Sequence, residues 1–290
     1  MSVARLTSCE LYGHMRNFWK TTVALGSLGF VLVSQPVYGR ATTERATTGR
    51  ATTAIATESR AVSELLPLQA DVTLPVQMGR TLRAGKVKPG TVFLVKTMQR
   101  VPVSADGYLE RGARVRGEVV SSDAGDGTAA HPSVLTIRFT QLSYRGRTVP
   151  VEMRAIAMAN LMNVDDTFLP ATGSTDRGNP NPASWTTTQV GGDEVVRSGW
   201  VGPVVGSGLR TVGSADFYGV YSLPSKPREG DGGMIPRAMG VFSTTAKGLY
   251  GYGEGVQMES SGGLITITNP MGRAVIRAGD NLLLEVVAGR

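Results

Sequence analysis

Apolar and polar residues alternate with a period of two along much of the chain between residues 82 and 155. Ala113, Val115 and Val119 alternate with charged residues, and the same pattern recurs over residues 135–139 and 149–155. Successive side chains of a strand point to opposite faces. The pattern therefore predicts strands with one buried face and one solvated face.

The second and third of these runs are separated by a tight-turn signal. Tyr144-Arg145-Gly146-Arg147 places a glycine where a short loop needs a positive φ, which predicts an antiparallel hairpin. Before this turn, Gln141-Leu142 interrupts the alternation of apolar and polar residues. We expect a β-bulge there.

A similar turn precedes several strands. An apolar residue, a charged residue, a spacer and then Gly90, Gly112 or Gly279 lead into apolar runs. Glycine adopts positive φ without steric cost, so the chain can reverse at each of these positions. Repetition of this turn favours a small β-barrel or sandwich, although chance repetition in a glycine-rich chain is an alternative.

The glycine and proline content divides the rest of the chain. Residues 160–263 hold 20 Gly and 7 Pro, which indicates a long insertion or a partly ordered meander. Residues 71–159 form the first β block, and strands within 264–290 are expected to complete the β domain. The predicted fold is therefore mainly β, a small barrel or sandwich with a long Gly/Pro-rich insertion.

The N-terminal region has the pattern of a targeting segment. Basic residues after Met15 precede nineteen uncharged residues that end at Gly39. We expect residues 1–39 to be a signal peptide with a true start at Met15, an uncleaved anchor being the alternative. Residues 40–70 repeat Arg-Ala-Thr-Thr and are predicted to be a disordered linker. The product is expected to be exported, to the periplasm or cell envelope, with no integral membrane span after cleavage.

Few residues are suited to metal or nucleophilic chemistry. The chain has one Cys and two His, and Cys9 and His14 lie before or within the targeting segment. Only His131 would remain, in a polar stretch typical of a surface loop. This excludes Cys/His zinc sites, disulfide scaffolds and Cys nucleophiles, and we expect no cofactor or metal.

Positive charge is concentrated in the first β block. Residues 80–158 carry 13 Lys or Arg and 6 Asp or Glu. Such a face could bind an envelope protein or an anionic envelope polymer, while a solvated strand face is the alternative. Nucleic acid is not expected, because stacking aromatics are not interleaved with the basic residues. The candidate binding residues are Arg114, Arg116, Arg138, Arg145, Arg147 and Arg154.

Two acidic pairs and one loop are weaker candidates for chemistry. Asp193-Glu194 lies between Trp185 and Trp200, which makes a carbohydrate site conceivable. Asp165-Asp166 is the other pair, and neighbouring acids usually point in different directions. Residues 123–127 contain oxygen ligands in a spacing typical of calcium loops but lack the distal glutamate, so a plain turn is expected.

Four segments of the first block carry a family resemblance: YLERGARVRGE (108–118), LTIRFTQL (135–142), RG (145–146) and VPV (149–151). Over residues 90–155 the chain resembles the C-terminal β-barrel of TrbI-like conjugation and type IV secretion scaffold proteins. The resemblance implies a barrel and a scaffold role. With residues 186–194 and 240–243, the block is also similar to uncharacterised exported bacterial proteins, which implies no activity.

Together these observations predict a non-enzymatic envelope protein that acts as a scaffold or binding module. The alternative is an extracellular protein that binds or hydrolyses carbohydrate through Trp185, Trp200, Asp193 and Glu194.

Overall fold

The computed structural model describes residues 68–104, 107–169, 185–197, 201–224 and 235–287. The predicted signal peptide and nearly all of the predicted linker lie outside these residues. Of the linker, Leu68 is described and packs against the core.

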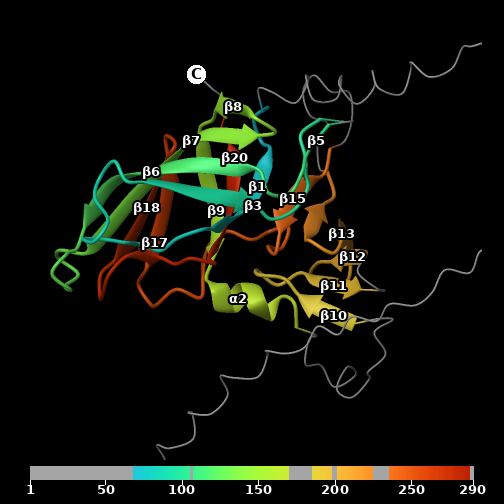
Figure 1. Ribbon diagram of the computed structural model, residues 1–290. Coiled ribbons are helices and arrows are strands. Elements are labelled where there is room, and N and C mark those ends of the chain that lie inside the picture. Colours follow the sequence, from blue (N-terminus) through green and yellow to red (C-terminus); the bar gives the residue numbers. More distant parts are fainter. Residues whose placement is uncertain (1–67, 105–106, 170–184, 198–200, 225–234, 288–290) are drawn as a thin grey trace, which may run out of the picture. The chain divides into compact units, whose positions relative to one another are not determined.

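Most of the described chain is strand, and ten strands form one large sheet (Figure 1). Their order is β16-β9-β20-β1-β3-β6-β7-β18-β17, and β8 pairs with β7. The strands are β1 (Thr73–Met78), β3 (Val92–Thr97), β6 (Arg114–Asp123), β7 (Ser133–Tyr144), β8 (Arg147–Pro150), β9 (Met153–Ala159), β16 (Gly248–Tyr250), β17 (Gln257–Ser261), β18 (Leu264–Asn269) and β20 (Asn281–Val286).

The two ends of this sheet approach each other. The backbone N–H of Ala155 in β9 donates to Ser260 Oγ in β17 at 2.9 Å. The sheet is therefore a nearly closed barrel, which confirms the predicted mainly β, barrel-like fold.

The barrel interior is filled by the apolar positions of the alternating runs. Phe93 and Phe139 meet edge to face inside it, with ring centroids 5.6 Å apart. Val95, Val115 and Ile137 are fully buried beside them. This burial of every second residue follows from the period of two in the sequence.

The predicted turns and bulge are also present. Gly90, Gly112 and Gly279 have φ values of 80°, 91° and 92°. Tyr144 pairs with Arg147 across the two-residue turn, as the hairpin signal predicts. The register of β6 and β7 shifts at Thr140, one residue before the predicted bulge.

A second sheet has six antiparallel strands in the order β10-β11-β12-β13-β14-β15. It lies within the segment predicted as an insertion, and each strand pairs with the next along the chain, so it is a meander. The strands are β10 (Trp185–Thr188), β11 (Glu194–Arg197), β12 (Gly202–Val205), β13 (Thr211–Ala215), β14 (Val220–Ser222) and β15 (Arg237–Gly240).

The barrel resumes earlier than the predicted boundary at residue 264. Strand β16 pairs in parallel with β9, and β17 pairs with β18. Both strands lie inside the 160–263 segment. Their sequences, Gly-Leu-Tyr and Gln-Met-Glu-Ser-Ser, are short or polar and carry little of the apolar alternation that marks the other barrel strands.

A second core lies against the outer surface of β9 and β20. Ala157 and Leu283 are fully buried there and belong to the same cluster as Val195, Val204 and Phe242 of the meander region. Neighbouring residues of β20 therefore enter different cores, since Leu282 and Leu284 face the barrel interior. Figure 1 shows β15, the last strand of the meander, beside β1 of the barrel.

The remaining elements are short. Helix α2 (Leu161–Asp166) begins after Asn160, whose Oδ1 accepts from the N–H of Asn163 at 2.9 Å. Strand β2 (Leu82–Arg83) pairs with β19 (Val275–Ile276), and β4 (Val101–Pro102) with β5 (Tyr108–Leu109). Among the described residues, no helix is both long and apolar enough to span a membrane.

Candidate functional site

Exposed aliphatic and basic side chains lie together on the outer surface of β3 and β6. In the register of the two strands, Leu94 is opposite Arg116 and Lys96 is opposite Arg114. Val92 and Leu94 are 40% and 46% exposed. The inward neighbours of these residues fill the barrel, so the backbone that carries this surface is rigid.

A cavity of about 720 Å³ continues this surface toward β1. Leu94, Lys96, Arg80 and Arg111 contribute to its lining. The guanidinium of Arg111 also lies 4.6 Å from the centroid of the Tyr218 ring, which links this edge to the meander. We define the basic face as Arg80, Val92, Leu94, Lys96, Arg111, Arg114 and Arg116.

The charges of the basic face are largely uncompensated. Arg80, Lys96, Arg114 and Arg116 form no ion pair with any described residue. Glu118, an acidic residue of β6 two positions after Arg116, is 3.1 Å from Arg138 and pairs with that residue. A surface with this charge attracts anionic groups.

The structure distributes the six predicted arginines unequally. Arg114 and Arg116 lie on the basic face, and Arg138 is paired at its margin. Arg145 and Arg147 lie at the adjacent hairpin, where the guanidinium of Arg145 is 5.3 Å from the Tyr144 ring centroid. Lys96, Arg80 and Arg111 belong to the face but were not predicted, because β3 has a single basic residue and the other two lie in turns.

Arg154 does not join the basic face. It lies on β9, where its Nε and Nη2 donate to Glu285 Oε2 at 2.7 and 2.6 Å. Arg237 Nη2 donates to Glu285 Oε1 at 2.8 Å. Glu285 is only 4% exposed, so this carboxylate joins β9, β15 and β20. A lone acidic residue in the apolar run of β20 was the sequence signal that could have revealed it.

Asp193 holds a loop in place. Its Oδ2 accepts from the N–H and from Oγ1 of Thr244 at 2.7 and 2.6 Å, and the residue is 5% exposed. Glu194 is exposed, so the two acids have opposite surroundings. Trp200 and the side chain of Trp185 lie outside the described residues, and the carbohydrate hypothesis stays a prediction.

The second acidic pair, like the first, is not part of a cluster of reactive side chains. Asp165 and Asp166 are exposed in the last turn of α2. Within the described parts of the chain, no three His, Cys, Asp or Glu side chains lie close enough to hold a metal ion together.

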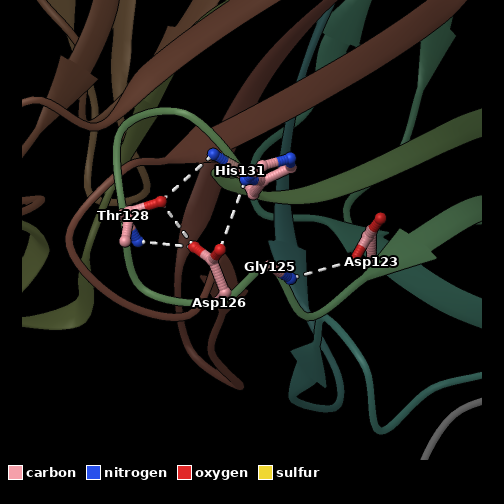
Figure 2. A network of polar contacts seen from close by, with 5 residues as sticks. All are labelled: Asp123, Gly125, Asp126, Thr128 and His131. Carbon is pink, nitrogen blue, oxygen red and sulfur yellow. Dashed lines mark hydrogen bonds and ion pairs between the residues drawn. The ribbon is translucent and has the colours of Figure 1, made fainter.

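The predicted turn at residues 123–127 is a network of local hydrogen bonds (Figure 2). Asp126 Oδ1 accepts from the N–H and Oγ1 of Thr128 at 2.9 and 2.6 Å, and Asp123 Oδ1 accepts from the N–H of Gly125. Nδ1 of His131 lies 3.3 Å from Asp126 Oδ2. Mainly because of the Thr128 hydroxyl, the pKa of Asp126 is lowered. Asp123 and Asp126 therefore stabilise the turn through these contacts.

A buried carboxylate that the sequence did not reveal lies near α2. Asp280 is fully buried, and its Oδ2 accepts from Tyr252 Oη and from the N–H of Arg277, both at 2.7 Å. Its Oδ1 accepts from the N–H of Leu161 at 3.2 Å. Burial, and then the charge of Asp280, raise the pKa of Tyr252 well above its usual range. The network attaches the loop before β17 and the start of α2 to β20.

Comparison with protein-family models, curated proteins and solved structures finds no match to this chain. The resemblance to TrbI-like barrels therefore stays a prediction, and the function is argued from the geometry of the chain itself.

Proposed function

We propose that this chain is a non-enzymatic binding or scaffold module of the cell envelope, of TrbI-like barrel type. It engages an acidic segment of another envelope protein through the basic face. The observation that carries the proposal is the arrangement of Lys96, Arg114 and Arg116 around the exposed side chains of Val92 and Leu94.

The aliphatic residues favour a protein over an anionic polymer as the partner. A polyanion would neutralise Lys96 and Arg114 but would leave Leu94 and Val92 in water. A protein segment that carries both acidic and aliphatic side chains would cover both kinds of surface. Burial of apolar area contributes affinity, and charge complementarity contributes association rate and orientation.

The envelope location rests on the sequence. The basic start and apolar stretch that end at Gly39 support export, and the lack of Cys after residue 9 fits a fold that needs no disulfide. The barrel gives the basic face a rigid support, which suits a scaffold because little ordering is required on binding.

Two synthetic peptides of equal charge test this proposal by fluorescence anisotropy. One alternates Glu with Leu and the other alternates Glu with Ser. We expect the Glu-Leu peptide to bind more tightly, and Leu94→Ser to weaken only that peptide, by about fivefold for roughly 1 kcal/mol of apolar contact. The double variant Lys96→Gln/Arg114→Gln should weaken both peptides.

The matched control is Arg210→Gln/Arg273→Gln, which removes the same charge from exposed positions outside the basic face. Equal loss of binding in the control would show unspecific attraction and would overturn the proposal. Equal binding of both peptides, unaffected by Leu94→Ser, would assign the face to an anionic polymer instead.

A photo-crosslinking residue at position 94 then tests the envelope partner. In an envelope fraction it should trap an acidic protein, and the Glu-Leu peptide should compete with that product. The same residue placed at position 264, which is 39% exposed on β18, provides the control for surface crosslinking. Identical products at both positions would contradict a specific partner.

A further inference from the structure

A second cavity, of about 430 Å³, lies on the outer surface of β9 and β20. Strand β15, strand β17 and the turn at residues 244–247 complete its wall. The polar and charged residues that line it include Arg154, Arg237, Thr245, Lys247, Ser260 and Glu285. Its volume is within the range typical of small-molecule sites, about 300 to 1,000 Å³.

The lining of this cavity has an excess of positive charge. Arg154, Arg237 and Lys247 face a single carboxylate, Glu285, among the lining residues. That carboxylate fixes both guanidiniums, because each of its oxygens accepts from one of them. The two arginines are therefore positioned before any ligand arrives, and a formal charge near +2 remains for a ligand to neutralise.

One hydrogen-bond donor in the cavity wall has no partner. Arg237 Nε is shielded from solvent and makes no hydrogen bond within the described residues. An unsatisfied buried donor costs about 1–3 kcal/mol, and more for a charged group. Nη1 of Arg154 and Nη1 of Arg237 are not among the donors to Glu285 and can donate to an acceptor oxygen in the cavity. Guanidinium groups are well suited to that acceptor because their planar fork matches phosphate and carboxylate oxygens.

The turn that carries Lys247 is held in position from the other side. Asp193 accepts from Thr244, and the N–H of Lys247 donates to Tyr250 Oη at 3.1 Å. The cations thus come from three separate segments, β9, β15 and this turn. Donors that converge from several directions fit a tetrahedral oxyanion better than a planar one.

We propose that this cavity binds the phosphate group of a small molecule, either inorganic phosphate or a small phosphomonoester. Arg154 and Arg237 contact the phosphate oxygens from the floor, and Lys247 contacts them from the rim. Glu285 acts as a positioning residue for the two arginines. The site is separate from the basic face, so it does not depend on the function proposed above.

Calorimetric titration with inorganic phosphate and with glycerol phosphate, near neutral pH and at low ionic strength, tests this site. Wild type should bind at least one of them at millimolar concentration or below, and preference between the two identifies the source of the group. Lys247→Gln should weaken binding by about fivefold to tenfold, which corresponds to about 1–1.4 kcal/mol for the loss of one solvent-exposed charge.

Lys247→Gln is informative because the Lys247 side chain is not part of the Glu285 ion pairs, so the fold should persist. A second variant, Arg237→Lys, keeps the charge beside Glu285 but loses the fork, and should also weaken phosphate binding. Lys96→Gln, on the basic face, is the control and should bind as wild type does.

Three outcomes would overturn the proposal. The first is the absence of binding by wild type to both phosphates at millimolar concentration. The second is equal weakening by Lys247→Gln and Lys96→Gln, which would show unspecific charge attraction. The third is tighter binding of succinate than of either phosphate, which would make the cavity a carboxylate site.

Discussion

Three buried carboxylates each join segments that lie far apart in the chain. Asp193 binds the turn at Thr244, Asp280 binds Tyr252 and Leu161, and Glu285 binds two arginines. Each is at most 5% exposed. Buried charges are tolerated when they are hydrogen-bonded or paired, which explains why every one of them has at least two donors.

Sequence reasoning could not identify the roles of Asp193 and Asp280. Asp193 appeared as half of an acidic pair, although its partner, Thr244, lies 51 residues away. Asp280 followed a turn glycine, and apart from the nearby N–H of Arg277 its donors come from α2 and from the loop before β17. Hydrogen bonds between such distant residues leave no local pattern, whereas turn glycines do.

Tyr252→Phe should lower the free energy of unfolding at pH 8 by about 1.5–3 kcal/mol, the usual value of a hydrogen bond to a charged group. The pKa of Tyr252 is raised in the fold, so the phenol contributes stability below its unfolded pKa of about 10 and loses it as the pH rises above that value. Urea unfolding at pH 8 and at pH 11 measures both effects.

Wild type should lose more stability than the variant between these two pH values, because Tyr252 ionises in the unfolded state of wild type while the fold keeps it protonated. An equal loss in both proteins would contradict the role assigned to Tyr252.

Gly117→Ala should destabilise the barrel by about 1–3 kcal/mol, the usual cost of overpacking. A Cβ at this inward position would overlap the ring of Phe93, which is 2% exposed and cannot move into solvent. Gly253→Ala is the matched control, since its nearest neighbour would be Val256 Cγ2 at 3.9 Å. Chemical denaturation of both variants measures the difference, and equal stabilities would contradict this packing.

At the scale of elements, the barrel strands and their turns were predictable because one face of each strand is buried. Alternation marked β6 and β7, and the turn glycines at 112 and 279 have the expected positive φ. The meander strands were not predicted individually. They have three to five residues each, and β12, β13 and β15 contain glycine, so their sequences have too few alternating positions to indicate a strand.

The candidate site was predicted in part. The arginines of β6 alternate with buried valines and were found for that reason. Arg80 and Arg111 reach the basic face from turns, where no periodic pattern indicates to which side a side chain points. Arg154 alternates equally well, but it lies on β9 and pairs with Glu285 of β20, and a partner on another strand cannot be recognised from the sequence of a single strand.

A buried glutamine connects the barrel to the last strands of the meander. Gln99 Nε2 donates to the carbonyl of Val220 at 3.0 Å, and its Oε1 accepts from the N–H of Gly240 at 2.7 Å. The Gln99 side chain therefore links the loop after β3 to both β14 and β15, in place of a backbone ladder. Gln99 is the side-chain hydrogen-bond partner of both backbone groups.

Gln99→Leu should therefore cost about 2–4 kcal/mol, because two buried backbone groups lose their partner. Hydrogen exchange should show the largest loss of protection at Gly240. Protection in β7 and β18, which pair with neither β1 nor β3, should decrease only as much as global stability does. A uniform loss across both sheets would contradict a local connection.

At the scale of the whole molecule, strand β20 contributes side chains to both cores. Leu284 of β20 lies in the barrel interior, while Leu283 lies in the core beneath the meander. The second core is built on the outer surface of barrel strands. The meander can therefore open while the barrel persists, but loss of the barrel removes the floor of the second core.

Leu283→Ala and Leu284→Ala should each reduce stability by about 2–5 kcal/mol. Their hydrogen-exchange patterns should differ. Leu283→Ala should increase exchange mainly in β10–β15, and Leu284→Ala should increase it throughout the described strands. Identical patterns for the two variants would show that the cores unfold as one unit.

The position of β20 also determines when the barrel can be completed during synthesis. Thr73 of β1 pairs with Glu285 of β20, and β20 in turn separates β1 from β9. During synthesis, β1 and β9 emerge long before the strand that joins them, so neither has its central neighbour until residues 281–286 are made. Pairing over such separations is slow, because the loop-closure entropy is lost before the contacts form. The barrel is thus completed by one late strand. Until β20 has been synthesised, the sheet of the nascent chain stays open between β1 and β9.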